Sequence, residues 1–120
     1  MVAANHHGRG VLLNASGVTA AQTSEIFQDH RQGVNKTVVC IHSNKDCTTA
    51  GAGAPLVIEV EDPTGENTAS TWSGFQLTSS DVAANTLLKI IIDAGCGSRI
   101  RCTVTPDSVA DIKIWAWSAD

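Results

Sequence analysis

The sequence is poor in aromatic residues, with no Tyr, 2 Phe and 3 Trp, and charged residues make up only 17% of it. No apolar run approaches the roughly 18 residues that a membrane-spanning helix requires. The formal net charge is −4. A negative charge argues against nucleic acid as a partner, because affinity for the phosphate backbone comes mainly from clustered Lys and Arg. We therefore expect neither a membrane nor a nucleic-acid partner.

The 4 cysteines include no pair with the C-x-x-C spacing that would indicate zinc or redox chemistry. Cys40 and Cys102 lie in strand-like runs, whereas Cys47 and Cys96 lie in polar or Gly-rich loops. Two interpretations stay open at this point. The cysteines are either buried small side chains with loop thiols, or they form local disulfides, Cys96–Cys102 or Cys40–Cys47. Neither interpretation requires a metal or another cofactor, and we expect none.

Enzyme motifs are also missing. The sequence has no Gly-rich phosphate loop and no G-x-S-x-G nucleophile elbow. Glu59 and Glu61 are two carboxylates on one predicted strand, whereas a retaining glycosidase needs carboxylates that face each other across a cleft. His6 and His7 lack the further ligands that a metal site needs. The sequence therefore predicts a protein that is not an enzyme.

The residues that are abundant favour strands. Thr, Val, Ile, Ala and Ser dominate, and turn signals recur about every ten residues. Strands are predicted at residues 11–15, 23–28, 35–42, 56–61, 70–77, 86–92, 99–105 and 110–117. About seven or eight short strands predict an all-β protein, an antiparallel β-sandwich that is jelly-roll-like or Ig-like. One domain, residues 11–120, is expected to follow a flexible N-terminal arm, residues 1–10.

The pattern of apolar and polar side chains predicts how three of these strands are placed. In the strand at 56–61, apolar residues alternate with Val57, Glu59 and Glu61, which predicts one wet side. The run TLLKIII at 86–92 is strongly apolar and is predicted to be a central strand. In the strand at 99–105, Arg99 and Arg101 are expected to point outward, away from the core. The two arginines either pair with acids on a neighbouring strand, such as Glu59 or Glu61, or contact another subunit; nucleic acid is a third alternative.

The predicted strand at 110–117 contains the run IKIWAW, and its alternating residues leave open which of its two faces belongs to the core. The alternating residues Ala110, Ile112, Ile114 and Ala116 have the size and polarity of an inter-sheet core. Trp115 and Trp117 then lie on the opposite face, next to Lys113 and Asp111. Either the N-terminal segment or a loop covers the two tryptophans, or a neighbouring subunit buries them. A flipped register, with the tryptophans in the core, is the third possibility.

Three stretches resemble small structural proteins of tailed bacteriophages. They are GAPLVIEVEDPTGENTAS, NTLLKIIIDAG followed by SRIRCTVTP, and ASGVTAAQTSEIF followed by GVNKTVVCIH. In that family an alternating strand leads into a D-P-x-(S)-G-x turn, and an apolar strand precedes an Arg-bearing strand. The resemblance spans roughly residues 11–117. The four cysteines, GSRIRC in place of a Leu-Pro-Arg-Thr-Trp lead, and the two tryptophans of the last strand depart from the family pattern.

The resemblance implies a β-sandwich component of the virion, of the capsid cement (decoration) type. Such a protein would sit on the outer surface of the capsid and bind the major capsid protein, and it would form a homotrimer. The expected interface residues are Arg9, Arg99, Arg101, Trp115 and Trp117, because exposed aromatic and arginine side chains supply anchors at interfaces. A tail, neck or fibre module is an alternative. A carbohydrate-binding sandwich is another, with Trp72, Trp115 and Trp117 stacking on sugar rings.

Overall fold

A computed structural model of the chain describes residues 9–28, 36–48, 55–61, 76–78, 82–92 and 99–119, and all regular structure within these ranges is β. The strands are β1 (Arg9–Val18), β2 (Gln22–Thr23), β3 (Phe27–Gln28), β4 (Lys36–Ser43), β5 (Leu56–Glu61), β6 (Gln76–Thr78), β7 (Leu88–Ile92), β8 (Arg99–Val104) and β9 (Ala110–Ala119). The predicted all-β class is confirmed. The structure describes nine strands, one more than the eight predicted ranges, because the range 23–28, predicted as one strand, is divided between β2 and β3.

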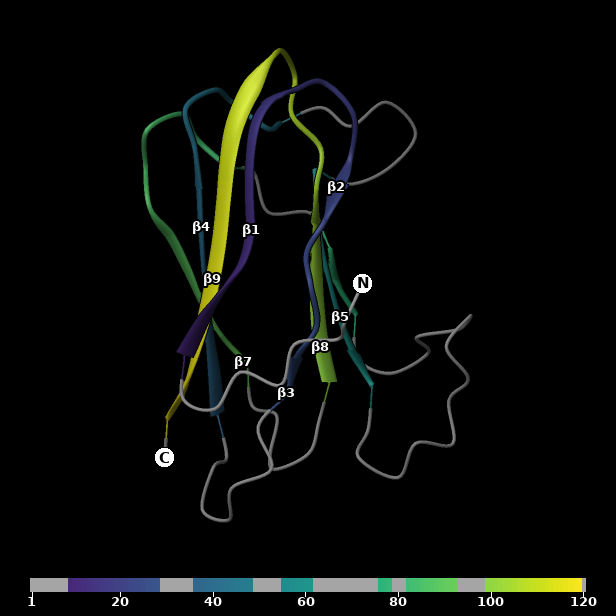
Figure 1. Cartoon of the computed structure of the whole chain (residues 1–120), viewed down its shortest axis with the longest axis vertical. Coiled ribbons are helices and arrows are strands. Elements are labelled where there is room, and N and C mark those ends of the chain that lie inside the picture. The colour runs from purple at the N-terminus through teal and green to yellow at the C-terminus, as the bar shows by residue number, and fades with distance from the viewer. Residues whose placement is uncertain are drawn as a thin grey trace.

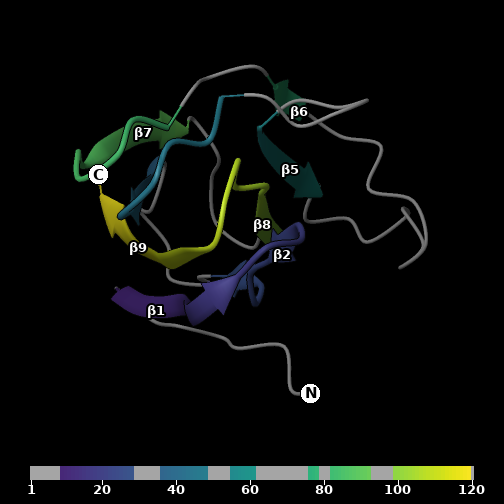
Figure 2. The same cartoon turned by 90° about the horizontal axis from the view of Figure 1, so that it is seen from above.

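The strands form two antiparallel sheets that pack face to face (Figures 1 and 2). The first sheet has the order β1-β9-β4-β7. The second has the order β2-β8-β5-β6, and β3 also pairs with β8. Seen from above, β7, β9 and β1 line one side of the molecule, and β6, β5, β8 and β2 line the other (Figure 2).

The order of the strands is that of a jelly roll. If β2 and β3 are counted as one interrupted edge strand, β1 pairs with β9, β2 and β3 with β8, β4 with β7, and β5 with β6. This nested pairing of first with last is a long hairpin rolled into two sheets, the double Greek key of a jelly roll. It decides between the two sandwich types that the sequence left open.

The core lies between the sheets and follows from the alternation of side chains. In β9, Ala110, Ile112, Ile114 and Ala116 are at most 1% exposed. The alternating inward positions of β5 and β8 are buried in the same way, as predicted. The largest fully buried side chains include Leu12, Phe27, Ile41, Leu56, Ile58, Ile100, Ile112 and Ile114. The register with the tryptophans in the core is therefore wrong.

Two predictions about the strands need correction. First, β1 begins at Arg9, so Arg9 and Gly10, which were assigned to the N-terminal arm, belong to the first sheet. Second, among the described strands β7 pairs only with β4, at an edge of the first sheet, and its Ile91 is 61% exposed. An apolar run predicts that the side chains of a strand are buried, but it does not predict whether the strand pairs with one neighbour or with two.

The three cysteines that the structure describes are buried thiols. Cys40, Cys47 and Cys102 are free and at most 1% exposed, which rules out both predicted disulfides in this structure. Cys96 itself lies outside the described residues. Cys47, predicted to be a loop thiol, belongs to the core because it forms an isolated bridge with Val82. Burial raises the pKa of the Cys102 thiol to about 12.

Candidate docking surface

The two outer faces of the sandwich differ in chemistry, and the face of the first sheet is the candidate site. On β9 the residues that alternate with the core positions are Asp111, Lys113, Trp115 and Trp117. Both tryptophans are partly buried, while Asp111 and Lys113 are exposed. The prediction that the tryptophans lie outside the inter-sheet core is confirmed.

Two cross-strand rows place apolar side chains around the tryptophans. In one row Trp115 lies between Val11 of β1 and Cys40 of β4, and Cys40 in turn pairs with Lys89 of β7. Side chains directly opposite each other on one face of a sheet are in contact range. This row therefore runs across all four strands of the first sheet.

In the adjacent row Trp117 lies between Arg9 of β1 and Val38 of β4, and Val38 pairs with Ile91 of β7. We use the name tryptophan face for the two rows and the lysines beside them. It comprises Val11, Val38, Cys40, Ile91, Trp115, Trp117, Lys36, Lys89 and Lys113. Arg9 belongs to the row by register, but its side chain lies outside the described residues.

Burial is uneven across the tryptophan face. Val38 and Cys40 point to the outer side of β4, yet they are only 6% and 1% exposed. Each lies between a tryptophan on β9 and a long side chain on β7, an arrangement in which large neighbours remove small side chains from water. By contrast, Val11 is 47% and Ile91 is 61% exposed. The face thus has a closed centre on β4 and open apolar ends on β1 and β7.

Lysines lie beside this apolar centre. The Lys113 ammonium is over the Trp115 ring, 5.7 Å from its centroid, in a cation–π contact. Burial raises the pKa of the Cys40 thiol, and the nearby Lys89 ammonium acts in the opposite direction. Lys36 and Lys89 are exposed. The charge on this face is therefore carried by cations that surround aromatic and aliphatic side chains.

Asp111 is the one described carboxylate on the outward side of β9, and it is already hydrogen-bonded. Its Oδ1 accepts from the Gly17 N–H at 2.9 Å, and its Oδ2 accepts from Asn44 at 3.4 Å. Gly17 adopts φ +64, a conformation that favours glycine, within an irregularity of the β1–β9 register. Asp111 thus holds the bulged end of β1 against β9.

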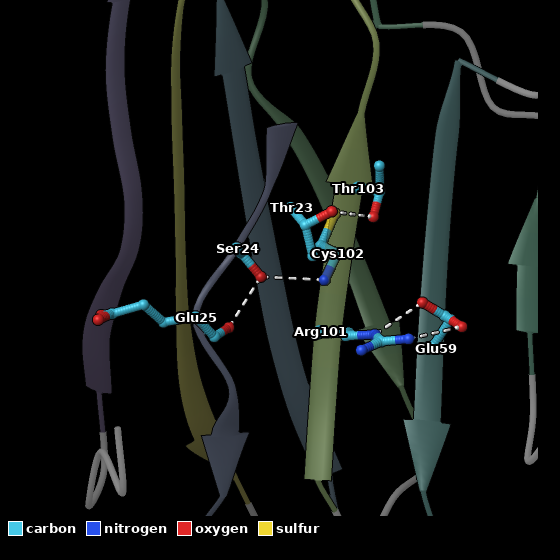
Figure 3. Close-up of polar contacts among 7 residues, drawn as sticks. All are labelled: Thr23, Ser24, Glu25, Glu59, Arg101, Cys102 and Thr103. Atoms are coloured by element: carbon cyan, nitrogen blue, oxygen red, sulfur yellow. Dashed lines mark hydrogen bonds and ion pairs between the residues drawn. The ribbon is translucent and has the colours of Figure 1, made fainter. Parts of the chain in front are cut away.

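On the outer face of the second sheet, here called the polar face, two described pairs of polar side chains join neighbouring strands. Arg101 of β8 donates from Nε and a terminal nitrogen to the two carboxylate oxygens of Glu59 on β5, at 2.8 and 3.3 Å (Figure 3). The hydroxyls of Thr23 and Thr103 are hydrogen-bonded at 3.0 Å. The predicted pairing of an arginine with an acid on the next strand is confirmed for Arg101.

Ser24 closes the edge of the second sheet. Its hydroxyl accepts from the buried Cys102 N–H at 3.0 Å and donates to the Glu25 carbonyl at 2.8 Å (Figure 3). One extra residue between β2 and β3, relative to β8, makes this a β-bulge. The next N–H, that of Glu25, donates to the Leu12 carbonyl of β1 at 2.8 Å, so the backbone joins the two sheets along this side.

The five predicted interface residues therefore lie on two opposite faces. Trp115, Trp117 and, by register, Arg9 belong to the first sheet, and Arg99 and Arg101 belong to β8 in the second. The sequence did not single out Val38, Cys40 or Ile91 for this site. In β4 and β7 apolar residues follow one another, so the sequence does not show which of them face outward, and the neighbours that place them beside tryptophans come from distant parts of the chain.

Comparisons with known proteins do not identify the chain: no protein-family model matches the sequence, and a search of curated proteins finds no significant match. Within the described ranges, no three His, Cys, Asp or Glu side chains are grouped so that they could hold a metal ion. In the same ranges no helix is long and apolar enough to cross a membrane.

Proposed function

We propose that this protein is a non-enzymatic capsid cement protein of a tailed bacteriophage. It binds the outer surface of the head through its tryptophan face and stabilises contacts between major capsid subunits. The observation that supports this most is the difference between the two outer faces. The polar face pairs Arg101 with Glu59, whereas the tryptophan face presents Val11, Ile91 and two partly exposed tryptophans beside lysines that form no ion pair with any described acid. Paired aromatics of this kind are typical anchors at interfaces.

The fold and the resemblance support the proposal in different ways. Jelly rolls occur in viral capsid proteins and in lectins, so the fold is compatible with a virion role but does not by itself imply one. The stretches that resemble phage structural proteins contain β5, β7 and β8. A rigid two-layer body is suited to clamping neighbouring subunits, because it loses little conformational entropy when it docks.

We further propose that the protein acts as a homotrimer with an N-terminal arm that adds contacts on the capsid. Icosahedral heads have three-fold and quasi-three-fold positions where three capsid subunits meet, and a trimer matches their symmetry. Residues 1–8 join the fold at Arg9, the register partner of Trp117. The arm is therefore attached beside the tryptophan face, where it can contact the same partner.

Binding to heads tests this function. Heads should be purified from phage in which the gene for this chain is deleted, and purified protein should then be added back. The protein should bind at saturable sites in hundreds of copies and raise the temperature at which the heads release DNA. A cryo-EM map should place the copies on the outer surface, at three-fold positions. If the heads bind no protein, the proposal is wrong; a handful of copies at the portal or tail would favour a tail, neck or fibre module.

A deletion of residues 1–8 tests the arm and leaves β1 whole. It should weaken binding to heads more than it lowers the free energy of unfolding of the isolated protein. Equal binding by the full and the shortened chain would remove the arm from the proposal. Size-exclusion chromatography with light scattering measures whether the free protein is a trimer.

A carbohydrate-binding module is the second candidate, and the tryptophan pair on one face favours it. Aromatic rings stack on sugar rings, and lectins include jelly rolls. A glycan array and a titration followed by tryptophan fluorescence distinguish the two functions. Quenching by a defined glycan in the absence of heads would favour this candidate over cement.

A further inference from the structure

Three lysines and one acid, Asp111, lie on the outer side of the first sheet, and the acid is already hydrogen-bonded to Gly17 and Asn44. Three of the four lysines in the sequence lie there: Lys36 and Lys89 beside the apolar rows on β4 and β7, and Lys113 on β9. All three are exposed. Across the part of the chain that the structure describes, no ion pair joins any of them to an acid. This concentration of cations occurs in a chain whose net charge is −4.

The lysines surround the apolar rows on three sides. Lys89 is in the row of Trp115 and Cys40, at the β7 edge. Lys36 lies beyond Trp117 toward one end of the sheet, and Lys113 lies beyond Trp115 toward the other. The fourth side is the β1 edge, where Val11 is exposed. An apolar centre with a charged rim is the common anatomy of a protein interface.

On the polar face, a cation is paired with an acid of the neighbouring strand. Arg101 on β8 is held by Glu59 on the adjacent strand, so the second sheet supplies its own counter-charge. On the tryptophan face the register partners of the lysines are Cys40, Asn14, His42 and Ala119, none of which is an acid. Asp111, two residues before Lys113 on the same side of β9, accepts hydrogen bonds from Gly17 and Asn44, so among the described residues no acid is paired with these lysines.

The cation–π contact discriminates between classes of anionic partner. Single-stranded nucleic acid binds by stacking bases on exposed aromatic rings. The Lys113 ammonium already lies over the Trp115 ring, 5.7 Å from its centroid. A base or a sugar that stacked there would have to displace it. A protein surface, in contrast, can pair with the ammonium while the ring stays in place.

We infer that the tryptophan face docks on an acidic protein surface, one with an apolar centre flanked by carboxylates. The inference rests on the proposed function in one respect, since it assigns an occupant to the proposed docking face. Complementary rim charges mainly raise the association rate and make binding sensitive to salt. Exposed charges are screened within about 8 Å at physiological ionic strength. Binding to the partner should therefore weaken as salt increases.

Synthetic peptides test this chemistry without heads. The chain should carry Trp72→Phe, so that the emission reports Trp115 and Trp117. A peptide with a leucine-rich centre flanked by glutamates should change this emission, with an effect that falls at high salt. The same peptide with lysines in place of glutamates, oligothymidine, and phosphatidylglycerol vesicles are the competing probes. A response to oligothymidine or to vesicles without a response to the acidic peptide would overturn the inference, as would no response to any probe.

Charge reversal provides the matched comparison. The triple variant Lys36→Glu, Lys89→Glu, Lys113→Glu should bind the acidic peptide at least ~10-fold more weakly, since three rim charges are reversed. Lys45→Glu, at an exposed position in the loop after β4, should bind like the parent protein. Circular dichroism checks that both variants are folded. Equal affinity of the triple variant and the parent would overturn the inference.

The same variants on heads separate this inference from the proposed function. If the parent and the triple variant bind heads equally well at low and high salt, the acidic partner is wrong and the cement function stands. If the acidic peptide binds and heads do not, the cement function is wrong and the acidic partner stands.

Discussion

The two outer faces of this jelly roll have the same backbone geometry and opposite chemistry. On the polar face, Arg101 is paired with Glu59 and Thr23 is hydrogen-bonded to Thr103, so β8 is joined to both of its neighbours by polar side chains. On the tryptophan face, large apolar side chains are neighbours and the lysines have no acid opposite them. The difference teaches that exposed residue types alone do not mark a binding face. What distinguishes the proposed docking face is that, among the described residues, its lysines have no acid paired with them.

The largest expected effect is on binding to heads, and it should differ between variants of the two faces. Trp115→Ala with Trp117→Ala should weaken binding to heads by about 100-fold or more, because central aromatic anchors dominate interface energies. Arg101→Ala, which changes the polar face, should leave head binding nearly unchanged. Sedimentation of heads with labelled protein measures both. If the tryptophan variant does not fold, Ile91→Gln changes the same face at a side chain that is 61% exposed. Loss of binding with Arg101→Ala alone would reverse the assignment of the faces.

The next effect concerns how the second sheet closes its edge. Ser24→Ala removes the hydroxyl that accepts from the buried Cys102 N–H. An unsatisfied buried donor costs about 1–3 kcal/mol of folding free energy. Thr23→Ala, next to it, removes an exposed hydroxyl pair and should cost less. Urea unfolding measures both variants. Equal losses for Ser24→Ala and Thr23→Ala would show that the Ser24 bridge adds nothing special to the edge.

The third effect is a pH dependence of the free energy of unfolding, which tests the burial of Cys102 between the two sheets. The pKa of Cys102 is raised by burial from 9.0 to about 12, so above pH 9 the unfolded chain releases this proton more readily than the folded one. The stabilisation is complete below pH 9 and is lost as pH rises toward 12, by at most about 1.4 kcal/mol for each pH unit. The difference in urea midpoint between the parent and Cys102→Ala should shrink between pH 8 and pH 10. A constant difference would contradict the buried thiol.

The smallest effect is the ion pair itself. The Arg101 and Glu59 side chains are 28% and 17% exposed, so water screens their attraction. A double-mutant cycle with Glu59→Gln and Arg101→Met should give a coupling of about 0.2–1 kcal/mol, smaller at high salt. A coupling near zero would mean that the Arg101–Glu59 ion pair forms but adds nothing to the free energy of unfolding. Either result leaves the tryptophan face unaffected, because the two residues belong to the other sheet.

Much of the fold follows from the sequence because alternation is a local property. The strand at Leu56–Glu61 matches the prediction at both ends, and the inward positions of β8 and β9 are correct. The site was predicted only in part. Alternation shows that Trp115 and Trp117 share a face, but which strands lie beside them depends on pairing between distant segments. For the same reason the sequence could not place Arg101 and the tryptophans on opposite sheets, or β7 at an edge.

The position of β9 also determines when the tryptophan face can form during synthesis. This strand lies between β1 and β4, and a hydrogen bond from Gly17 to Asp111 joins positions 94 residues apart. Such non-local pairing slows folding to roughly milliseconds to seconds, because the closure entropy of a long loop precedes any gain. During synthesis, β1 and β4 have no shared neighbour until β9 leaves the ribosome. Both tryptophans of the proposed docking face belong to that strand, so this face is incomplete in a nascent chain until the first sheet is able to close.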